Sequence, residues 1–427
     1  MQELFTASLS RLKSHRLPGL ALGAEHVHPH YGGHSIVNVP ASVCNWLGIP
    51  PIGAAALDPE IIKPLGKKYQ NVILLLLDAL SLNRFVNWLE AGISPIWGEL
   101  SKQGVFVPLT SITPSTTAAA LTSLWTGRSA KEHGIVGYEM WLKEYGMVVN
   151  SILHSPMSFK GDAGSLARAG FNPENFVKST RIGSHLAEHD IAVYAFQHHS
   201  IADSGLSKML LKNVKIQPFH THSDLWVNTR GILEDKSDRQ KYIWIYWGEL
   251  DYMAHNYGPD DERTIDEFTR FSSAFEKLLL NQLSLTARKD TLLILLADHG
   301  QIRSQPDGNF DLHNHPSLVR RLHIMPTGEN RLMSLFIRPG QREAVREYFE
   351  HTWPNQFTLY EPSNAVENGL FGPGEPHPHL YDRLGDLIVM AKGESYLWWS
   401  RKVDHLYGRH GGLSADEMLV PFLAVEL

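Results

Sequence analysis

Two uninterrupted apolar runs that end in acidic residues constrain the fold of this chain more than any other feature. They are NVILLLLDAL at Asn71–Leu80 and DTLLILLADHG at Asp290–Gly300. A short continuous apolar block of this kind is typical of a parallel strand that helices cover on both faces. YIWIYWGELD at Tyr242–Asp251 and DIAVYAFQHH at Asp190–His199 predict two further strands.

Helix-like stretches alternate with these strands. They lie at Ala118–Trp125, Gly183–Glu188 and Asp260–Leu285. Alternation of strand and helix indicates an α/β fold with a doubly wound, mostly parallel sheet. A chain of 427 residues is long enough for one large α/β domain with insertions or for two domains.

Changes in residue composition along the chain predict three segments of different structure. Residues 1–65 are rich in proline and glycine and predict an N-terminal wrap. Residues 66–304 and 392–427 hold the strands and predict the catalytic core. Residues 305–391 include the Gly/Pro-rich NGLFGPGEPHPH and predict a smaller inserted, cap-like segment.

Composition excludes several classes of protein. The net charge of −6 gives no sign of the basic surface that nucleic-acid binding requires. The chain has a single cysteine, Cys44, which excludes an internal disulfide. The N-terminus MQELFTASLSRLKSHRLPG lacks the apolar region of a signal peptide, and runs such as Val72–Leu77 are too short to span a bilayer. We therefore expect a cytoplasmic protein that binds neither nucleic acid nor membrane, and the oligomeric state is left open.

Carboxylates and imidazoles follow three of the predicted strands. Asp78 ends the first run, Asp298 and His299 end the second, and Asp251 ends the Tyr242 run with His255 four residues later. Each one alone also fits a helix cap, a solvated helix turn or a simple turn. Because ligands bind beyond the carboxyl ends of such strands and buried carboxylates need compensating cations, the set together predicts a two-metal hydrolytic site. Mixed Asp and His ligands suit Zn²⁺, or else Mn²⁺ or Fe.

A pair of threonines precedes an apolar helix-like stretch in TSITPSTTAAALTSLWTG. Thr116 and Thr117 come directly before Ala118–Leu121. Hydroxyl side chains at this position cap the free N–H groups of a helix. The same N–H groups also favour an anion, so the pair predicts both a helix start and a place where a phosphate could bind.

The order of these residues resembles that of the alkaline phosphatase superfamily, and within it the type I phosphodiesterase/nucleotide pyrophosphatase family. The resemblance rests on five motifs, and it extends over roughly Asn71 to Phe422. The motifs are LLLLDAL, TPSTTAAALTSLWTGRSAKEHGI, ELDYMAHNYGP, ADHG and RHGGLSADEMLVPF. The fold that it implies is an α/β/α sandwich around a mostly parallel sheet, in agreement with the strand pattern.

The resemblance also implies roles for single residues. Thr117 corresponds to the nucleophile, because relatives have a Thr-Gly pair nine residues later and Thr126-Gly127 lies at that spacing. One divalent metal would be held by Asp78, Asp298, His299 and Thr117, and the other by Asp251, His255 and His410. The implied enzyme is a metal-dependent phosphodiesterase or nucleotide pyrophosphatase. It would act on a small phosphate ester or nucleotide through a covalent phosphothreonine intermediate.

One position departs from the family pattern. Nucleotide pyrophosphatases have TFPNH from the nucleophile onward, with the Asn contacting a phosphate oxygen, and Ala120 stands at that position here. A methyl group donates no hydrogen bond, so the nucleotide substrate is less firmly implied than the hydrolase class. A phosphomonoesterase, a phosphonate hydrolase and a metal-binding module without catalysis stay open as alternatives. The histidine-rich HVHPHYGGH at His26–His34 predicts either a polar surface loop or a further metal site.

Overall fold

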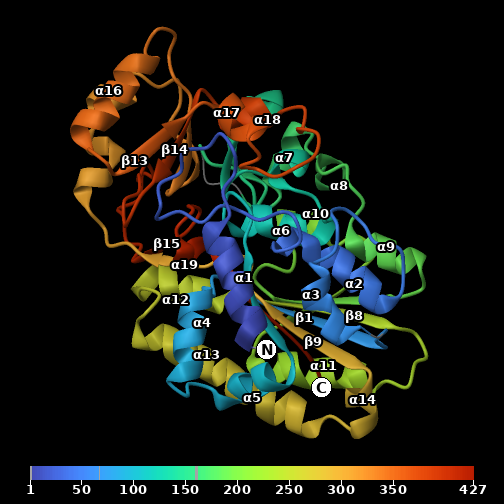
Figure 1. Cartoon of the computed structure of the whole chain (residues 1–427). Helices are drawn as coiled ribbons and strands as arrows, with labels where there is room; N and C mark the ends of the chain where they lie inside the picture. Colours follow the sequence, from blue (N-terminus) through green and yellow to red (C-terminus); the bar gives the residue numbers. More distant parts are fainter. Residues whose placement is uncertain (1, 67, 159–161) are drawn as a thin grey trace.

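A seven-stranded sheet lies at the centre of the computed structural model, which describes residues 2–66, 68–158 and 162–427 (Figure 1). Its strands are β1 (Asn71–Leu77), β2 (Val105–Thr110), β6 (Ala192–His198), β7 (Lys215–Phe219), β8 (Lys241–Trp247), β9 (Thr291–Leu296) and β16 (Leu419–Glu426). They lie in the order β2-β16-β9-β1-β8-β6-β7. β16 runs antiparallel to both of its neighbours, β2 and β9, and the other described neighbours in this sheet are parallel. The four predicted strands are thus confirmed.

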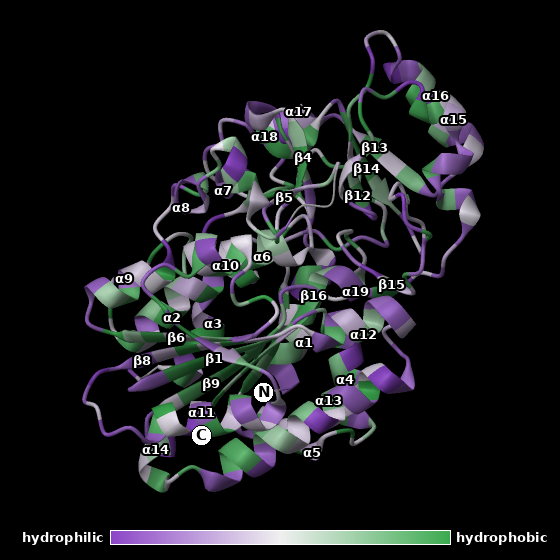
Figure 2. Ribbon diagram, turned by 180° about the vertical axis from the view of Figure 1, so that it is seen from behind, coloured by the Kyte–Doolittle hydropathy of each residue, from purple (hydrophilic) through white to green (hydrophobic). Residues whose placement is uncertain are grey.

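Helices cover both faces of this central sheet. The main ones are α2 (Val39–Leu47), α4 (Leu82–Glu90), α5 (Pro95–Gln103), α6 (Thr117–Thr126), α9 (Ile182–Glu188), α11 (His222–Glu234) and α13 (Glu262–Ala274). Figures 1 and 2 show α5, α11 and α13 on one side of the sheet and α2, α6 and α9 on the other. The α/β/α sandwich predicted from the sequence is therefore confirmed.

Several predicted elements end earlier than the sequence runs indicate, among them one strand and one helix. The strand predicted over Tyr242–Asp251 stops at Trp247, because Gly248 is the N-cap of helix α12 (Glu249–Tyr257). The helix predicted over Asp260–Leu285 is α13, followed by a π-helical turn at Phe275–Leu279 and a 3₁₀ turn. Both corrections concern boundaries, where apolar periodicity carries little information.

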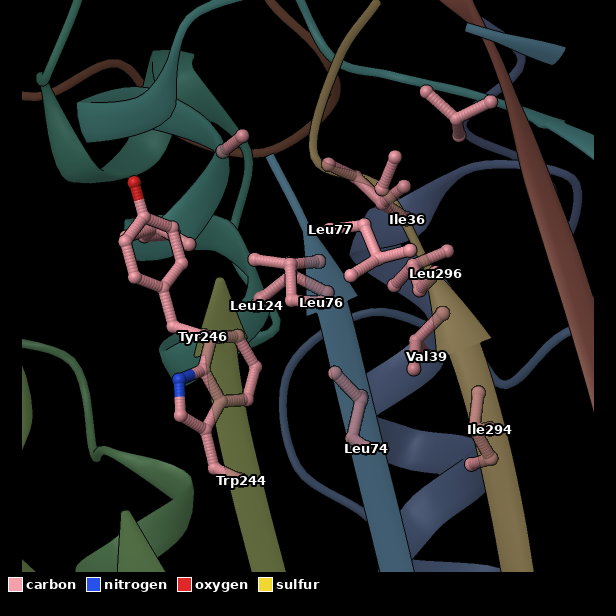
Figure 3. Packing of buried hydrophobic residues seen from close by; sticks show 14 of the residues in the cluster. Ile36, Val39, Leu74, Leu76, Leu77, Leu124, Trp244, Tyr246, Ile294 and Leu296 are labelled. Atoms are coloured by element: carbon pink, nitrogen blue, oxygen red, sulfur yellow. The ribbon is translucent and has the colours of Figure 1, made fainter. Parts of the chain in front are cut away.

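Large side chains from the sheet and from one helix layer form the core beside the predicted site (Figure 3). Leu74 and Leu76 of β1, Trp244 of β8 and Leu124 of α6 pack together, each at most 2% exposed. The rings of Trp125 and Trp244 lie 5.1 Å apart between their centroids. Burying such side chains contributes roughly 1.5–3 kcal/mol each, so α6 is firmly fixed on the sheet.

A second seven-stranded sheet, antiparallel throughout, lies beside the sandwich (Figure 2). Its strands are β3 (Glu139–Leu142), β4 (Met147–Asn150), β5 (Ser155–Pro156), β11 (Thr327–Glu329), β12 (Leu332–Leu335), β13 (Phe357–Tyr360) and β14 (Leu387–Ala391). Their order is β13-β14-β12-β11-β3-β4-β5. Residues 305–391 thus share this sheet with strands from residues 139–156. The division of the chain into wrap, core and inserted segment stays a prediction.

Further elements complete the described part of the chain. A two-stranded sheet pairs β10 (Ile302–Arg303) with β15 (Gly408–Arg409). The remaining helices are α1 (Gln2–Ser14), α3 (Pro59–Ile62), α7 (Ala130–His133), α8 (Pro173–Phe176), α10 (Gly205–Leu210), α14 (Leu285–Lys289), α15 (Pro316–Val319), α16 (Arg342–Thr352), α17 (Pro362–Glu367), α18 (Leu380–Leu384) and α19 (Ala415–Met418). No helix in the described ranges combines the length and the apolar character needed to cross a bilayer.

The histidine-rich segment near the N-terminus is packed inside the protein. His26, His28 and His34 are at most 3% exposed, so the expectation of a polar surface loop is wrong. Burial lowers the pKa of His28 and of His34 to about 4, which keeps both imidazoles neutral at physiological pH. In the described part of the chain, the side chains clustered closely enough to hold a metal ion do not include these histidines.

A buried ion pair joins the second sheet to the segment before β16. Arg331, between β11 and β12, donates to both carboxylate oxygens of Glu417 on α19, at 2.7 and 2.9 Å. Both side chains are at most 1% exposed. The same carboxylate accepts from the backbone N–H groups of Gly412 and Ser414, so it also holds the loop that carries His410.

We expect Glu417→Gln to lower the free energy of unfolding by about 3 kcal/mol, because the substitution leaves the Arg331 guanidinium buried without a countercharge. Urea unfolding of the variant and the wild type measures the difference. Glu361→Gln is the matched control, since Glu361 pairs with Arg342 and Arg346 at the surface and such pairs contribute at most about 1 kcal/mol. Equal losses in the two variants would contradict this account.

Candidate active site

The strand directions bring the seven residues singled out in the sequence to one edge of the central sheet. Asp78 directly follows β1, and Asp298 and His299 follow β9. Asp251 and His255 lie one turn apart on α12, which begins just after β8. Because β16 is antiparallel to β9, the loop before it, with His410, reaches the same edge.

A first group of ligating atoms lies around His299. Its Nε2 is 3.3 Å from Asp78 Oδ1 and 3.6 Å from Asp298 Oδ2. The three side chains are at most 2% exposed, and their ligating atoms lie within 4.8 Å of one another. The Thr117 hydroxyl oxygen is 3.2 Å from the same nitrogen and 3.5 Å from Asp78 Oδ2. Thr117 therefore borders this group.

A second group lies around Asp251. Its Oδ1 is 3.2 Å from Nε2 of His255 and 3.7 Å from Nε2 of His410. Ligating atoms of Asp251, His299 and His410 lie within 4.8 Å of one another. The rings of His299 and His410 stack with centroids 4.0 Å apart. His299, expected in the first group only, thus adjoins both groups, and His255 adjoins the second through Asp251.

The side chains in both groups are arranged as metal ligands usually are. Each imidazole has its Nδ1 within hydrogen-bond distance of a backbone carbonyl: His255 with Gly408 at 2.8 Å, His299 with Gly300 at 3.0 Å and His410 with Ser115 at 3.1 Å. With Nδ1 as the donor, Nε2 carries no proton, and its lone pair faces the neighbouring carboxylates. Asp78 Oδ1 and Asp298 Oδ2 are buried without a hydrogen-bond partner. A divalent cation would satisfy all of these atoms, so the residues fit such an ion.

Burial and mutual repulsion shift the acid–base properties of these carboxyls. Burial, with the charges of Asp298 and Asp251, raises the pKa of Asp78 well above its usual range. Burial and the charge of Asp251 raise the pKa of Asp298 to about 7. Burial also acts on Asp251, but the imidazoles of His255 and His410 hold its pKa below its ordinary value. Without cations, this cluster of carboxyls is costly to keep ionised.

Thr117 lies at the first position of α6. Thr116 occupies the N-cap position, but its side chain makes no capping hydrogen bond and instead donates to Glu329. The expectation that the threonine pair caps the helix through its hydroxyls is therefore wrong. The backbone N–H groups of the first turn of α6 stay available to an anion beside the Thr117 hydroxyl.

A cleft of about 520 Å³ opens over these groups. Its floor includes Thr117, Asp251, His255 and His410. Its other walls come from residues in and near the second sheet, among them Tyr138, Glu139, Glu329, Trp398 and Trp399. The volume is in the range of pockets that bind small organic molecules.

Three residues at the site escaped the sequence analysis. Tyr246 donates its hydroxyl to Asp78 Oδ2, and Gln301 Nε2 donates to Asp251 Oδ1 at 3.2 Å. Glu329 accepts from Thr116 and from the N–H of Tyr138. Gln301 lies two residues after His299, and Tyr246 lies five before Asp251, so proximity could have pointed to both. Glu329 lies in the second sheet and has no local signal in the sequence.

We expect Tyr246→Phe to weaken metal binding by about 10- to 100-fold, because the lost hydroxyl orients the Asp78 carboxylate. The phenylalanine ring preserves the packing, so the melting temperature of the metal-free protein should change little. Titration of the metal-free protein with Zn²⁺ measures the effect. Tyr242→Phe is the matched control on the same strand, and an equal loss of affinity in that variant would contradict the role of Tyr246.

Comparisons with known proteins agree with this fold. Residues 72–413 match the model of the type I phosphodiesterase/nucleotide pyrophosphatase family. Murine ectonucleotide pyrophosphatase/phosphodiesterase 5, solved in an inactive form with AMP, superposes with a TM-score of 0.61 at 18% identity, covering 83% of this chain and 87% of that one. Phosphonoacetate hydrolase from Sinorhizobium meliloti, with phosphonoformate, gives a TM-score of 0.59 at 16% identity, covering 84% and 91%. A search of curated proteins finds no match.

Proposed function

The chain belongs to the type I phosphodiesterase/nucleotide pyrophosphatase family, and on that premise we propose that it is a metal-dependent phosphodiesterase with Thr117 as its nucleophile. One observation carries the proposal. The Thr117 hydroxyl lies at the start of α6, at the base of the cleft, and borders the Asp78, Asp298 and His299 group. Two divalent ions, most simply Zn²⁺ with Mn²⁺ or Fe as alternatives, would be held by the two groups of Asp and His side chains.

Bound cations at such a site lower the pKa of a nearby hydroxyl and neutralise charge on a phosphoryl group. The chain itself supplies the nucleophile: the Thr117 hydroxyl gives its proton to water in the cleft while its oxygen attacks phosphorus and forms a new P–O bond. The bond from phosphorus to the leaving alcohol breaks, and that alcohol takes up a proton from water in the cleft. A water molecule then attacks the phosphothreonine, which restores the Thr117 hydroxyl and releases the product.

The backbone of α6 takes over the contact that the family's Asn makes. Ala120 is fully buried and has no polar side-chain atom. The two amide side chains that line the cleft, Asn256 and Asn330, already donate to the carbonyls of Tyr252 and Leu397. The first-turn N–H groups of α6 lie next to Thr117, and they would bind the phosphoryl oxygens.

A substrate panel tests the proposal. Metal-loaded protein is assayed with p-nitrophenyl monoesters and diesters, dinucleotides and phosphonoacetate, and kcat/KM is compared. We expect the diesters to be turned over best. The similarity to phosphonoacetate hydrolase makes phosphonoacetate the second candidate substrate. A higher kcat/KM for phosphonoacetate than for the esters would mean that the same site hydrolyses a phosphonate in place of an ester. Bound metal with no turnover of any compound would favour a non-catalytic binding module.

A further inference from the structure

Glu329 of the second sheet reaches the start of α6. It is the last residue of β11, and its Oε1 accepts a hydrogen bond from the Thr116 hydroxyl and, at 2.8 Å, from the backbone N–H of Tyr138. Neither group of ligating side chains found among the described residues includes Glu329. A carboxylate at this place therefore has a use other than metal binding.

The Thr116 backbone has the conformation in which a threonine normally caps a helix. Its φ and ψ are −142° and 145°, and those of Thr221, the N-cap of α11, are −141° and 162°. Thr221 accepts a hydrogen bond at 3.2 Å from the N–H of Asp224, whereas the Thr116 side chain makes no capping bond. Because residue type and backbone conformation match, the difference lies in the Thr116 side chain, which Glu329 engages.

Contacts on two sides hold the Glu329 side chain in place. Tyr138 donates to the same carboxylate oxygen as Thr116. The backbone of Gly411 packs directly against Glu329, because a methyl group added at Gly411 would overlap the Glu329 Cβ. Glu329 therefore cannot follow the Thr116 hydroxyl toward the helix, and the hydroxyl stays turned toward the second sheet.

The orientation of Thr116 decides what the N-terminus of α6 can bind. A capping threonine occupies the N–H of the second or third helical residue, which here is Ala118 or Ala119. An anion held beside Thr117 would use the same N–H groups. Capping by Thr116 and binding of a phosphoryl group thus compete for the same donors.

We propose that Glu329 is a positioning residue: it keeps the Thr116 hydroxyl away from α6 and leaves the first-turn N–H groups free for the phosphoryl oxygens of the substrate. This inference rests on the proposed function and extends it, because it gives the second sheet a part in binding the phosphoryl group.

Two substitutions in combination test the inference. Glu329→Ala frees the Thr116 hydroxyl to cap α6. The value of kcat/KM for a p-nitrophenyl diester and the affinity of the metal-loaded protein for inorganic phosphate, measured by calorimetry, should then both fall about 5- to 10-fold, the size of a typical N-cap interaction. Adding Thr116→Ala removes the competing hydroxyl, so the double variant should regain most of both losses. If Glu329 only supported the fold, the double variant would be no better than Glu329→Ala.

Two controls locate the effect at Thr116, and all variants are compared at equal metal content. Glu329→Gln keeps an oxygen that accepts from Thr116, so it should lose much less phosphate affinity than Glu329→Ala. Glu139 lines the same cleft but accepts from Trp399 at 3.0 Å. Whatever activity Glu139→Ala loses, the addition of Thr116→Ala should not restore it.

The outcomes separate this inference from the proposed function. Unchanged phosphate affinity in Glu329→Ala, a double variant as impaired as Glu329→Ala, or an equally impaired Glu329→Gln would each overturn the role of Glu329 and leave the hydrolase standing. Phosphate binding that falls in Glu329→Ala and recovers in the double variant, without turnover of any ester, would support the role of Glu329 and overturn the proposed function.

Discussion

Replacing Thr117 with alanine is expected to lower kcat by more than about 10³-fold, because the reaction would lose its nucleophile. The side chain borders the metal groups without packing against a large apolar surface, so metal content and melting temperature should stay close to those of the wild type. Initial rates with a p-nitrophenyl diester, metal analysis and thermal unfolding measure the three quantities. Thr117→Ser keeps a hydroxyl and should retain part of the rate.

The matched control for this substitution lies on the same helix. Thr122 of α6 is buried and donates its hydroxyl to the Ala118 carbonyl within the helix. Thr122→Ala therefore removes a buried threonine hydroxyl without touching the cleft, and its rate should stay near that of the wild type. Acid quenching during turnover should in addition trap a phosphorylated Thr117 peptide. A Thr117→Ala variant with the wild-type rate would show that water attacks directly and that the covalent route is wrong.

Removal of the metal ions is expected to abolish activity and to lower the melting temperature, with a larger decrease at pH 8 than at pH 5. The pKa of Asp298 is about 7 in the folded protein without metal, against an ordinary value of 3.8. Between those values the folded chain holds a proton that the unfolded chain releases, so the free energy of unfolding falls as pH rises from about 4 to 7 and stays low above 7. The loss is on the order of 4 kcal/mol, about 1.4 kcal/mol for each pH unit between the two pKa values. Bound cations take the place of that proton and restore stability.

Thermal unfolding with and without chelator, at pH 5 and at pH 8, measures this effect. Asp298→Asn is the informative variant, because the amide carries no charge at either pH. Its metal-free form should lose less stability between pH 5 and pH 8, and added Zn²⁺ should stabilise it less. A chelator that changes the melting temperature equally at both pH values would contradict the role of the buried carboxyls.

Local sequence patterns predicted the central sheet well. The runs at Asn71–Leu80 and Asp290–Gly300 are buried strands β1 and β9, because seven or so consecutive apolar residues can be buried only where helices cover both faces. The second sheet escaped prediction as a unit. Its strands come from residues 139–156 and 327–391, and the pairing of Glu139 with Gly328 joins positions far apart in the chain. Such pairing depends on tertiary contacts that no local pattern encodes.

For the candidate site, the sequence predicted which side chains take part, and the fold determined which of them lie in contact. Asp78, Asp298 and His299 follow strands, so their convergence could be expected from the topology of parallel sheets. Tyr246 and Gln301 lie close in the sequence to predicted site residues, whereas Glu329, which accepts from Thr116, comes from the second sheet, carries no motif and could not be predicted. For the histidines near the N-terminus the sequence pattern gave a wrong prediction, because this loop of polar residues is buried.

The sequence by itself determined the class of fold and, with the family resemblance, the candidate ligating side chains and the threonine at the start of α6, because apolar runs, motifs and residue chemistry are local properties. Only the tertiary structure decided that His299 adjoins both groups, that Thr116 bonds to Glu329 instead of capping α6, and that a cleft opens between Thr117 and residues of the second sheet. These features arise where elements distant in the chain pack together, and the shape of the space between them depends on all of them at once.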